Sequence, residues 1–236
     1  FMEFCTLQIY VFKFFVLILS IVRITSYINE THQLPEVNGD IFYYFGYGSN
    51  MLMKRIHIQN PTAVKLGVGE LKNYRLDFNT FTERWDGAPA TIVPTSNATV
   101  FGTLWEIDLI HLPSIDDQEG VAENIYFAES MPICLANGTQ IIARTYLLVD
   151  QPKCELSSFF CNEVPEGRQP SKTYLQCLVK GALETGLPTH YVDWLKSVKH
   201  NGKVVSDLEQ YLELQDVELN EACELSESGS DKNTIY

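Results

Sequence analysis

Apolar residues follow two different periods along the chain. Between residues 41 and 149 they form short runs or alternate with polar residues, as they do in β-strands. From residue 171 they recur every three or four residues, which is the period of amphipathic helices. A predominance of strands followed by helices indicates an α+β fold with a mixed sheet or a small barrel. The predicted strands are 41–45, two within 63–78, 90–94, 100–107, 126–127, 131–135 and 140–149, and the predicted helices are 51–56, 108–118, 171–185 and 191–199.

The segment 41–55 (IFYYFGYGSNMLMKR) combines a buried strand, a glycine turn and the start of a helix. Gly46 and Gly48 interrupt the apolar run, and Ser49 and Asn50 are favourable N-cap residues for the helix that follows. This geometry directs free backbone N–H groups and the positive end of a helix dipole towards one spot. From this segment alone, an anion-binding turn and an ordinary tight turn both remain open.

The start of the chain has the pattern of a secretory signal peptide. An apolar run at 14–22 follows Lys13 and is too short to span a bilayer comfortably, and Thr25 and Ser26 supply small polar residues for cleavage near Ser26. We therefore expect a secreted protein without a stable membrane anchor, with an uncleaved signal anchor as the alternative. The sequence divides into a leader (1–26), a linker (27–39), a folded domain (40–205) and an acidic, partly disordered tail (206–236), which is expected to begin as a partly helical arm.

Sequons and cysteines bear on the same question. The sequons at Asn29, Asn97 and Asn137 are candidate glycosylation sites and support secretion. Removing Cys5 with the leader leaves five of the six cysteines, so at most two disulfides form. Cys154 and Cys161 are close together in a loop-like stretch and are the predicted pair. The alternative is a set of buried free thiols in a chain descended from a cytosolic protein.

Charge and motifs exclude several classes of function. With 17 basic and 30 acidic residues the net charge is −13, which disfavours nucleic-acid binding. The histidines are scattered and no CxxC pair occurs, so no metal site is predicted. GxSxG, complete GxGxxG and Walker A motifs are absent from the sequence, so catalytic-serine, dinucleotide-dependent and nucleotide-dependent chemistry lack support.

Three carboxylates, Asp116, Asp117 and Glu119, end the predicted helix 108–118. A helix C-terminus is unfavourable for anions, so exposure is expected for Asp116 and Asp117. Glu119 differs because Gly120 and an apolar residue follow it, where a carboxylate could enter a cavity. Burial there would raise its pKa towards the range of a general acid or base, while simple exposure remains the alternative.

Four motifs together resemble the γ-glutamylcyclotransferase family, over about residues 40–203. They are YFGYGSN at 44–50, IH with NP at 56–61, DQEGV at 117–121, and GA with GLP at 181–188. The resemblance implies a small mixed β-barrel-like sheet with flanking helices, no cofactor and often a homodimer, and it makes 40–205 a catalytic domain. It further implies cyclisation of γ-glutamyl amino acids to 5-oxoproline and a free amino acid.

The resemblance also implies roles for individual residues. Glu119 matches the catalytic acid/base of the family, and the stretch Tyr44 to Ser49 matches a backbone cradle for the γ-glutamyl group. The implied substrate-binding residues are Tyr44, Phe45, Gly46, Tyr47, Gly48, Ser49, Asn50, Tyr126 and Tyr174. The chain departs from the family at Gly46, where alanine is common, in the Cys-bearing loop 153–170, and in its leader and sequons.

Three functions are therefore compared. The first is a secreted enzyme that acts on a small γ-glutamyl substrate, with Glu119 as its acid/base. The second is a secreted non-catalytic protein of the same fold that binds γ-glutamyl ligands or interacts with a host. The third is a relative acting on glutathione or γ-glutamyl-amines, which the sequence alone does not distinguish from the first.

Overall fold

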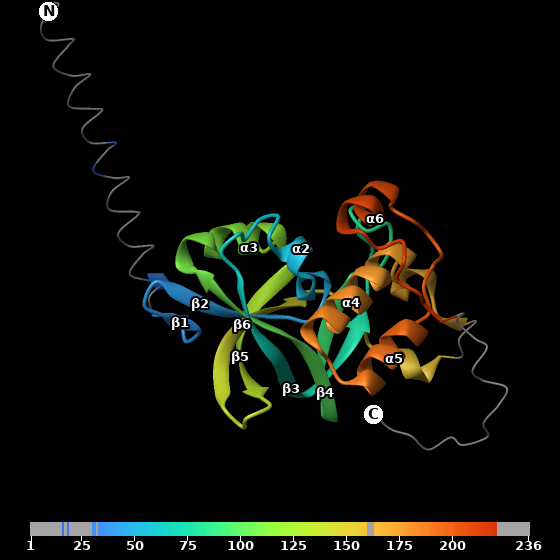
Figure 1. The fold of residues 1–236 in the computed structure, drawn as a ribbon, viewed down its shortest axis with the longest axis horizontal. Helices are drawn as coiled ribbons and strands as arrows, with labels where there is room; N and C mark the ends of the chain where they lie inside the picture. The colour runs from blue at the N-terminus through green and yellow to red at the C-terminus, as the bar shows by residue number, and fades with distance from the viewer. Residues whose placement is uncertain (1–15, 17, 19–29, 32, 160–162, 221–236) are drawn as a thin grey trace, which may run out of the picture.

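The computed structural model describes residues 16, 18, 30–31, 33–159 and 163–220, and a closed mixed barrel is its centre (Figure 1). The strands follow the order β1-β2-β4-β3-β5-β6, and β2 also pairs in parallel with β6 through Tyr44 and Arg144, which closes the barrel. This confirms the α+β class and the barrel-like sheet. The strands are β1 (Val37–Asn38), β2 (Ile41–Gly46), β3 (Val64–Phe78), β4 (Ala90–Asp108), β5 (Tyr126–Leu135) and β6 (Gln140–Leu148).

Short helices flank the barrel. Figure 1 shows α4, α5 and α6 gathered on one side, with α2 and α3 near one end of the barrel. The helix 171–185 was predicted nearly to the residue, because the Ser171 side chain accepts from the Tyr174 N–H as N-cap and Gly186 ends the helix in the left-handed conformation. The α-helices are α2 (Met53–Ile56), α3 (Leu112–Gln118), α4 (Lys172–Thr185), α5 (Thr189–Ser197) and α6 (Ser206–Leu212). The 3-10 helices are η1 (Ser49–Met51), η2 (Leu109–His111), η3 (Leu156–Ser158) and η5 (Glu166–Arg168).

The central strands are longer than the sequence pattern predicts. β3 and β4 are each one continuous strand where two were expected, and β5 unites the two short strands predicted at 126–127 and 131–135. The turn predicted at Asn97 is a local irregularity within paired strands. Asn73 and Asn97 both have positive φ, and the Asn97 N–H donates to Asn73 Oδ1 at 3.2 Å. Asparagine tolerates this conformation, so the strands continue past it.

Phe45 fills the barrel interior. Its side chain is fully buried and contacts the positions of two glycines, Gly102 on β4 and Gly69 on β3. A Cβ at Gly102 would lie 2.8 Å from the Phe45 ring, and one at Gly69 would lie 3.0 Å from it. The absence of side chains at these two positions therefore makes room for the phenylalanine.

The ordered fold extends beyond the predicted domain boundaries of 40 and 205. In the predicted linker, β1 pairs with β2 and Glu36 is buried. In the predicted tail, α6 is followed by a segment that packs on α4, with Leu212 and Leu214 fully buried. Of the predicted leader, only residues 16 and 18 are described. Within the described ranges, no helix combines the length and apolarity needed to cross a bilayer.

The sequons and cysteines are only partly covered. Asn97 and Asn137 are exposed, as glycosylation requires, and Asn29 lies outside the described residues. Cys154 is exposed, so the alternative in which every thiol is buried is wrong. Cys161 lies outside the described residues, so its pairing with Cys154 stays a prediction.

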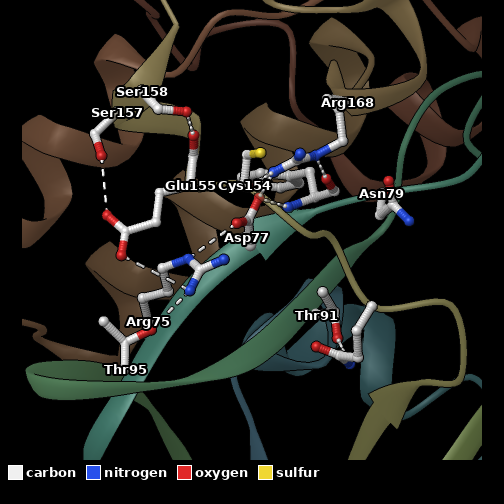
Figure 2. A network of polar contacts seen from close by, with 12 residues as sticks. Arg75, Asp77, Asn79, Thr91, Thr95, Cys154, Glu155, Ser157, Ser158 and Arg168 are labelled. Atoms are coloured by element: carbon white, nitrogen blue, oxygen red, sulfur yellow. Dashed lines mark hydrogen bonds and ion pairs between the residues drawn. The ribbon is translucent and has the colours of Figure 1, made fainter.

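A polar network fixes the Cys-bearing loop on β3 (Figure 2). The buried Asp77 carboxylate accepts from Arg75 Nε at 3.1 Å and from the guanidinium of Arg168. Arg168 also donates to the carbonyls of Phe78 and, at 3.0 Å, of Cys154. One buried carboxylate is thereby paired with two arginines, which satisfies its charge and holds both ends of the loop.

Candidate functional site

A cavity of about 330 Å³, called the Glu119 cavity below, brings together residues from distant parts of the chain. Its lining includes four of the predicted site residues, Ser49, Glu119, Tyr126 and Tyr174. They come from η1, the end of α3, the start of β5 and the first turn of α4. The cavity size suits a small molecule such as a dipeptide.

Glu119 presents one carboxylate oxygen for chemistry. It is the C-cap of α3 and is only partly exposed. Its Oε1 accepts from Asn50 Nδ2 at 3.1 Å and from Gln118 Nε2 at 3.0 Å. Its Oε2 has no hydrogen bond to any described residue, so that oxygen is available to take a proton from a bound ligand.

The surroundings tune the basicity of Glu119. Burial raises the pKa of its carboxyl above 4.5. Four interactions lower the pKa in part: the charges of Arg55 and Arg84 and the hydrogen bonds from Gln118 and Asn50. The net direction is upward, so Glu119 is a stronger base than an exposed glutamate. A carboxylate held by two donors and shifted in this direction is suited to general acid–base catalysis.

Asn50 positions Glu119 rather than capping a helix, which corrects the prediction from its sequence. Neither the Ser49 nor the Asn50 side chain caps η1 or α2, whose N-caps are Gly48 and Leu52. Asn50 is buried instead, and its amide also donates to the Tyr44 hydroxyl at 3.0 Å. Because α2 has only four residues, the predicted helix dipole is too small to contribute much.

Two residues that sequence reasoning missed complete this network. Gln118 donates to Asn50 Oδ1 at 3.2 Å as well as to Glu119, and its own Oε1 accepts from Arg55 Nη1 at 3.3 Å. Arg55 is buried in the cavity wall. Gln118 lies inside the DQEGV motif and Arg55 beside the YGSN motif, and these neighbouring motifs were the available signal.

The tyrosines form a buried layer around the cavity. Tyr126 donates to the Ala90 carbonyl at 2.8 Å, the Ala90 N–H donates to the Tyr174 hydroxyl at 3.1 Å, and Tyr47 donates to the Tyr146 carbonyl. Burial raises the pKa of Tyr47, Tyr126 and Tyr174, so they are neutral hydrogen-bonding groups. Tyr126 and Tyr174 line the cavity, and their binding of substrate stays a prediction.

The residues predicted to form the backbone cradle lie in two different elements, β2 and η1, and in the segment between them. Tyr44, Phe45 and Gly46 belong to β2, and the Phe45 side chain packs in the barrel core. Gly48 is needed for close packing, because a Cβ there would lie 3.0 Å from the Tyr174 hydroxyl. Ser49 and Asn50 are the first two residues of η1, so their backbone N–H groups have no acceptor within that helix. They are the part of the stretch best placed to bind an anionic group.

The two aspartates of α3 behave differently. Asp117 is exposed, as expected, and lies at the cavity wall. The expectation of simple exposure is wrong for Asp116, which accepts from Arg144 Nη2 at 2.7 Å and from the Tyr146 hydroxyl at 2.6 Å. Arg144 Nη1 also donates to the buried Glu36 at 3.0 Å. This ion-pair network joins α3, β6 and the segment before β2, and so fixes the helix that carries Glu119.

Metal-binding groups are not assembled in the described part of the chain. No cluster of three or more His, Cys, Asp or Glu residues there has an arrangement that could hold a metal ion. The chemical groups that do converge on the cavity are carboxylates, guanidinium groups, tyrosine hydroxyls and backbone N–H groups.

Comparisons with known proteins give consistent results. A model described as the AIG2-like family matches residues 99–195. The gamma-glutamylcyclotransferase of Mus musculus is 34% identical over 181 residues, which cover 74% of this chain and 89% of that protein. The Homo sapiens protein of the same name is 33% identical over 178 residues, covering 72% of this chain and 87% of that protein. A solved structure named gamma-glutamyl cyclotransferase is 31% identical, with a TM-score of 0.64 and coverage of 73% of this chain and 98% of that structure.

Proposed function

Because the chain belongs to the γ-glutamylcyclotransferase family of enzymes, we propose that it cyclises γ-glutamyl amino acids to 5-oxoproline and releases a free amino acid. One observation carries the proposal for this chain. Glu119 is held in a cavity wall by Asn50 and Gln118, with one oxygen left free and its pKa raised. A base of this kind is what the first chemical step requires.

In the proposed mechanism, Glu119 moves one proton in each direction. Its Oε2 removes a proton from the substrate α-amine, whose nitrogen then attacks the γ-carbonyl carbon and forms the new C–N bond. Collapse of the tetrahedral intermediate breaks the original amide C–N bond, while Glu119 returns the proton to the departing amine. Ring closure is intramolecular, so holding the substrate folded supplies much of the acceleration.

Fixed donors of this chain would stabilise the anionic groups of the substrate. The free N–H groups at the start of η1 lie beside the cavity through Ser49, and Arg55 contributes a buried positive charge. Tyr126 and Tyr174 form part of the cavity wall, and both hydroxyl groups are hydrogen-bonded to the backbone of Ala90. Donors fixed before the reaction starts need no reorganisation as negative charge develops.

The decisive test is Glu119→Gln in an assay of 5-oxoproline release from γ-glutamyl-alanine. The variant keeps the size of the side chain and loses the base, so we expect kcat to fall by about 10²- to 10⁴-fold. Glu129→Gln removes the same charge from an exposed position on β5 and serves as the matched control. Wild-type turnover by folded Glu119→Gln would disprove this mechanism.

A substrate panel separates the remaining alternatives. It contains γ-glutamyl-alanine, glutathione and γ-glutamyl-lysine, each scored for 5-oxoproline. We expect γ-glutamyl-alanine to be the preferred substrate. Release of no product from any of them, combined with a rise in Tm on adding the ligands, would instead indicate a binding protein.

We also propose that the mature protein is secreted and glycosylated. From the family resemblance, we further propose that it forms a homodimer. The apolar leader pattern and the exposure of Asn97 and Asn137 support secretion. Expression in a eukaryotic secretory host, followed by N-glycosidase treatment and mass spectrometry, tests the leader and the sequons. Sedimentation of the purified protein tests the oligomeric state.

A further inference from the structure

Arg84 is a cation of the Glu119 cavity that forms no ion pair or hydrogen bond with any described residue, although its charge helps to lower the pKa of Glu119. It lies in the loop between β3 and β4 (residues 79–89) and lines the same cavity as Glu119. It is exposed, and among the described residues no carboxylate is within ion-pair distance of its guanidinium and no hydrogen bond engages it. Its position differs from that of Arg55, which is buried and engaged by Gln118.

The residues beside Arg84 are firmly held. Trp85 is buried and packs against Tyr174, with ring centroids 4.8 Å apart. The Asp86 carboxylate pairs with Lys203 Nζ at 3.0 Å, and the Asp86 carbonyl accepts from Asn201 Nδ2 at 2.8 Å. The backbone that carries Arg84 is thus anchored to α4 and to the segment after α5, which limits the entropy lost when its side chain binds a ligand.

The base of the same loop is connected to the Cys-bearing loop. The Ala88 N–H donates to the Gln169 carbonyl at 2.9 Å, next to Arg168, whose guanidinium is fixed on Asp77 (Figure 2). Thr82 N–H donates to the Gly87 carbonyl at 3.0 Å and closes the loop on itself. Arg84 is therefore an exposed charge on a braced loop at the rim of a cavity.

The arrangement of charges gives the cavity a direction. Of the lining residues, Arg55 is buried, Glu119 is partly exposed and Arg84 is exposed, so Arg84 marks the solvent side of the cavity. The γ-glutamyl end of a substrate must reach Glu119 to cyclise, so the departing part extends towards the rim. In a γ-glutamyl amino acid this part carries a carboxylate, whereas in a γ-glutamyl-amine it does not.

We propose that Arg84 is a specificity-determining residue that binds the carboxylate of the departing amino acid. The inference rests on the proposed function. A guanidinium forms two parallel charge-assisted hydrogen bonds with a carboxylate, which fixes its orientation as well as its position. Arg84 thereby selects γ-glutamyl amino acids over γ-glutamyl-amines, the distinction that the sequence motifs leave open.

The test compares γ-glutamyl-alanine with γ-glutamyl-alaninamide, which differ only at this carboxylate. For Arg84→Ala we expect KM for γ-glutamyl-alanine to rise about 10- to 100-fold, with KM for the amide changing less than about twofold. Arg84→Lys keeps the charge without the two-pronged geometry, so it should recover part of the loss. Glu83→Gln, on the exposed neighbour outside the cavity lining, is the matched control.

Each outcome bears on the proposal separately from the proposed function. An equal loss on both substrates would place Arg84 on their shared γ-glutamyl end and overturn the inference, and no loss on either would also overturn it. If wild-type protein releases no 5-oxoproline, the proposed function fails, and calorimetric Kd values for the two ligands then decide the role of Arg84. A wild-type preference for γ-glutamyl-alanine that disappears in Arg84→Ala would still support it.

Discussion

At the residue scale, Glu119 combines features that work against stability. It lies at the C-terminal end of α3, where the helix dipole disfavours a negative charge, and burial penalises its ionised form. Hydrogen bonds from Asn50 and Gln118 offset part of this cost. A residue that is unfavourable in its local setting but held by several others is a common feature of catalytic positions.

The charge of Arg55 should set the acidic limb of the pH–rate profile. Arg55 is the largest influence that lowers the pKa of Glu119, because its positive charge favours the carboxylate. Glu119 must be ionised to act as a base, so kcat/KM rises with pH through its pKa. Arg55→Met removes the charge, so the pKa of Glu119 rises and the limb moves to higher pH.

The measurement is kcat/KM for γ-glutamyl-alanine as a function of pH. Arg55→Lys retains a positive charge at the same position and should leave the limb closer to that of the wild type. A limb that stays in place in Arg55→Met, or moves to lower pH, would contradict this account of the Glu119 environment.

Individual site residues differed in how far the sequence revealed them. Glu119 was predictable because its carboxylate precedes Gly120 within a recognisable motif. The role of Asn50 was not, because Ser49 and Asn50 form a good N-cap pattern, and only the approach of α3 shows that the Asn50 amide binds Glu119 instead. Local propensity was overridden by a tertiary contact across 69 positions in sequence.

At the element scale, α3 is held by an ion-pair network rather than by its own length. It has seven residues, too few to be stable alone, and Asp116 ties it to Arg144 on β6. Glu36 binds the other side of the same guanidinium. The segment before β2, predicted as a linker, therefore supports the helix that positions Glu119.

Glu36→Gln tests this support. The change keeps the shape of a buried side chain but removes the charge that faces Arg144, so we expect a loss of about 1–3 kcal/mol in the free energy of unfolding. Arg144 keeps its ion pair with Asp116 in this variant, so its charge is not left unpaired and the loss of stability stays moderate. Urea unfolding measures it, with Asp108→Asn at an exposed site as the control. Equal stability of Glu36→Gln and wild type would show that this contact does not hold the segment.

At the scale of the whole molecule, closure of the barrel depends on contacts that no local pattern encodes. The alternating pattern predicted strands and their inward-facing residues, but β2 meets β6 through Tyr44 and Arg144, which are 100 positions apart. The same closure sets the Tyr44 ring against Tyr146, with centroids 5.9 Å apart. Fold class was thus predictable from periodicity and motif, whereas strand pairing and the ionic network required the folded structure.

The end of the described chain belongs to the same folded unit. Gln176 Nε2 donates to the carbonyls of Leu214 and Val217 at 3.1 and 3.0 Å, and Leu212 and Leu214 are fully buried against the core. These contacts lie on α4, the helix that contributes Tyr174 to the Glu119 cavity. An acidic composition therefore did not make residues 206–220 a solvated tail.

A chain that ends at residue 205 should be much less stable than one that ends at residue 220. Each lost leucine removes about 1.5–3 kcal/mol of burial, and together they amount to a large part of a typical 5–15 kcal/mol stability. Thermal unfolding of the two chains measures the difference, and 5-oxoproline release reports on Tyr174 and the cavity. The chain ending at 220 keeps every contact of this segment that is described here, so it serves as the control. Equal Tm values would mean that α4 is stable without its cover, and that the sequence-based boundary at 205 was adequate after all.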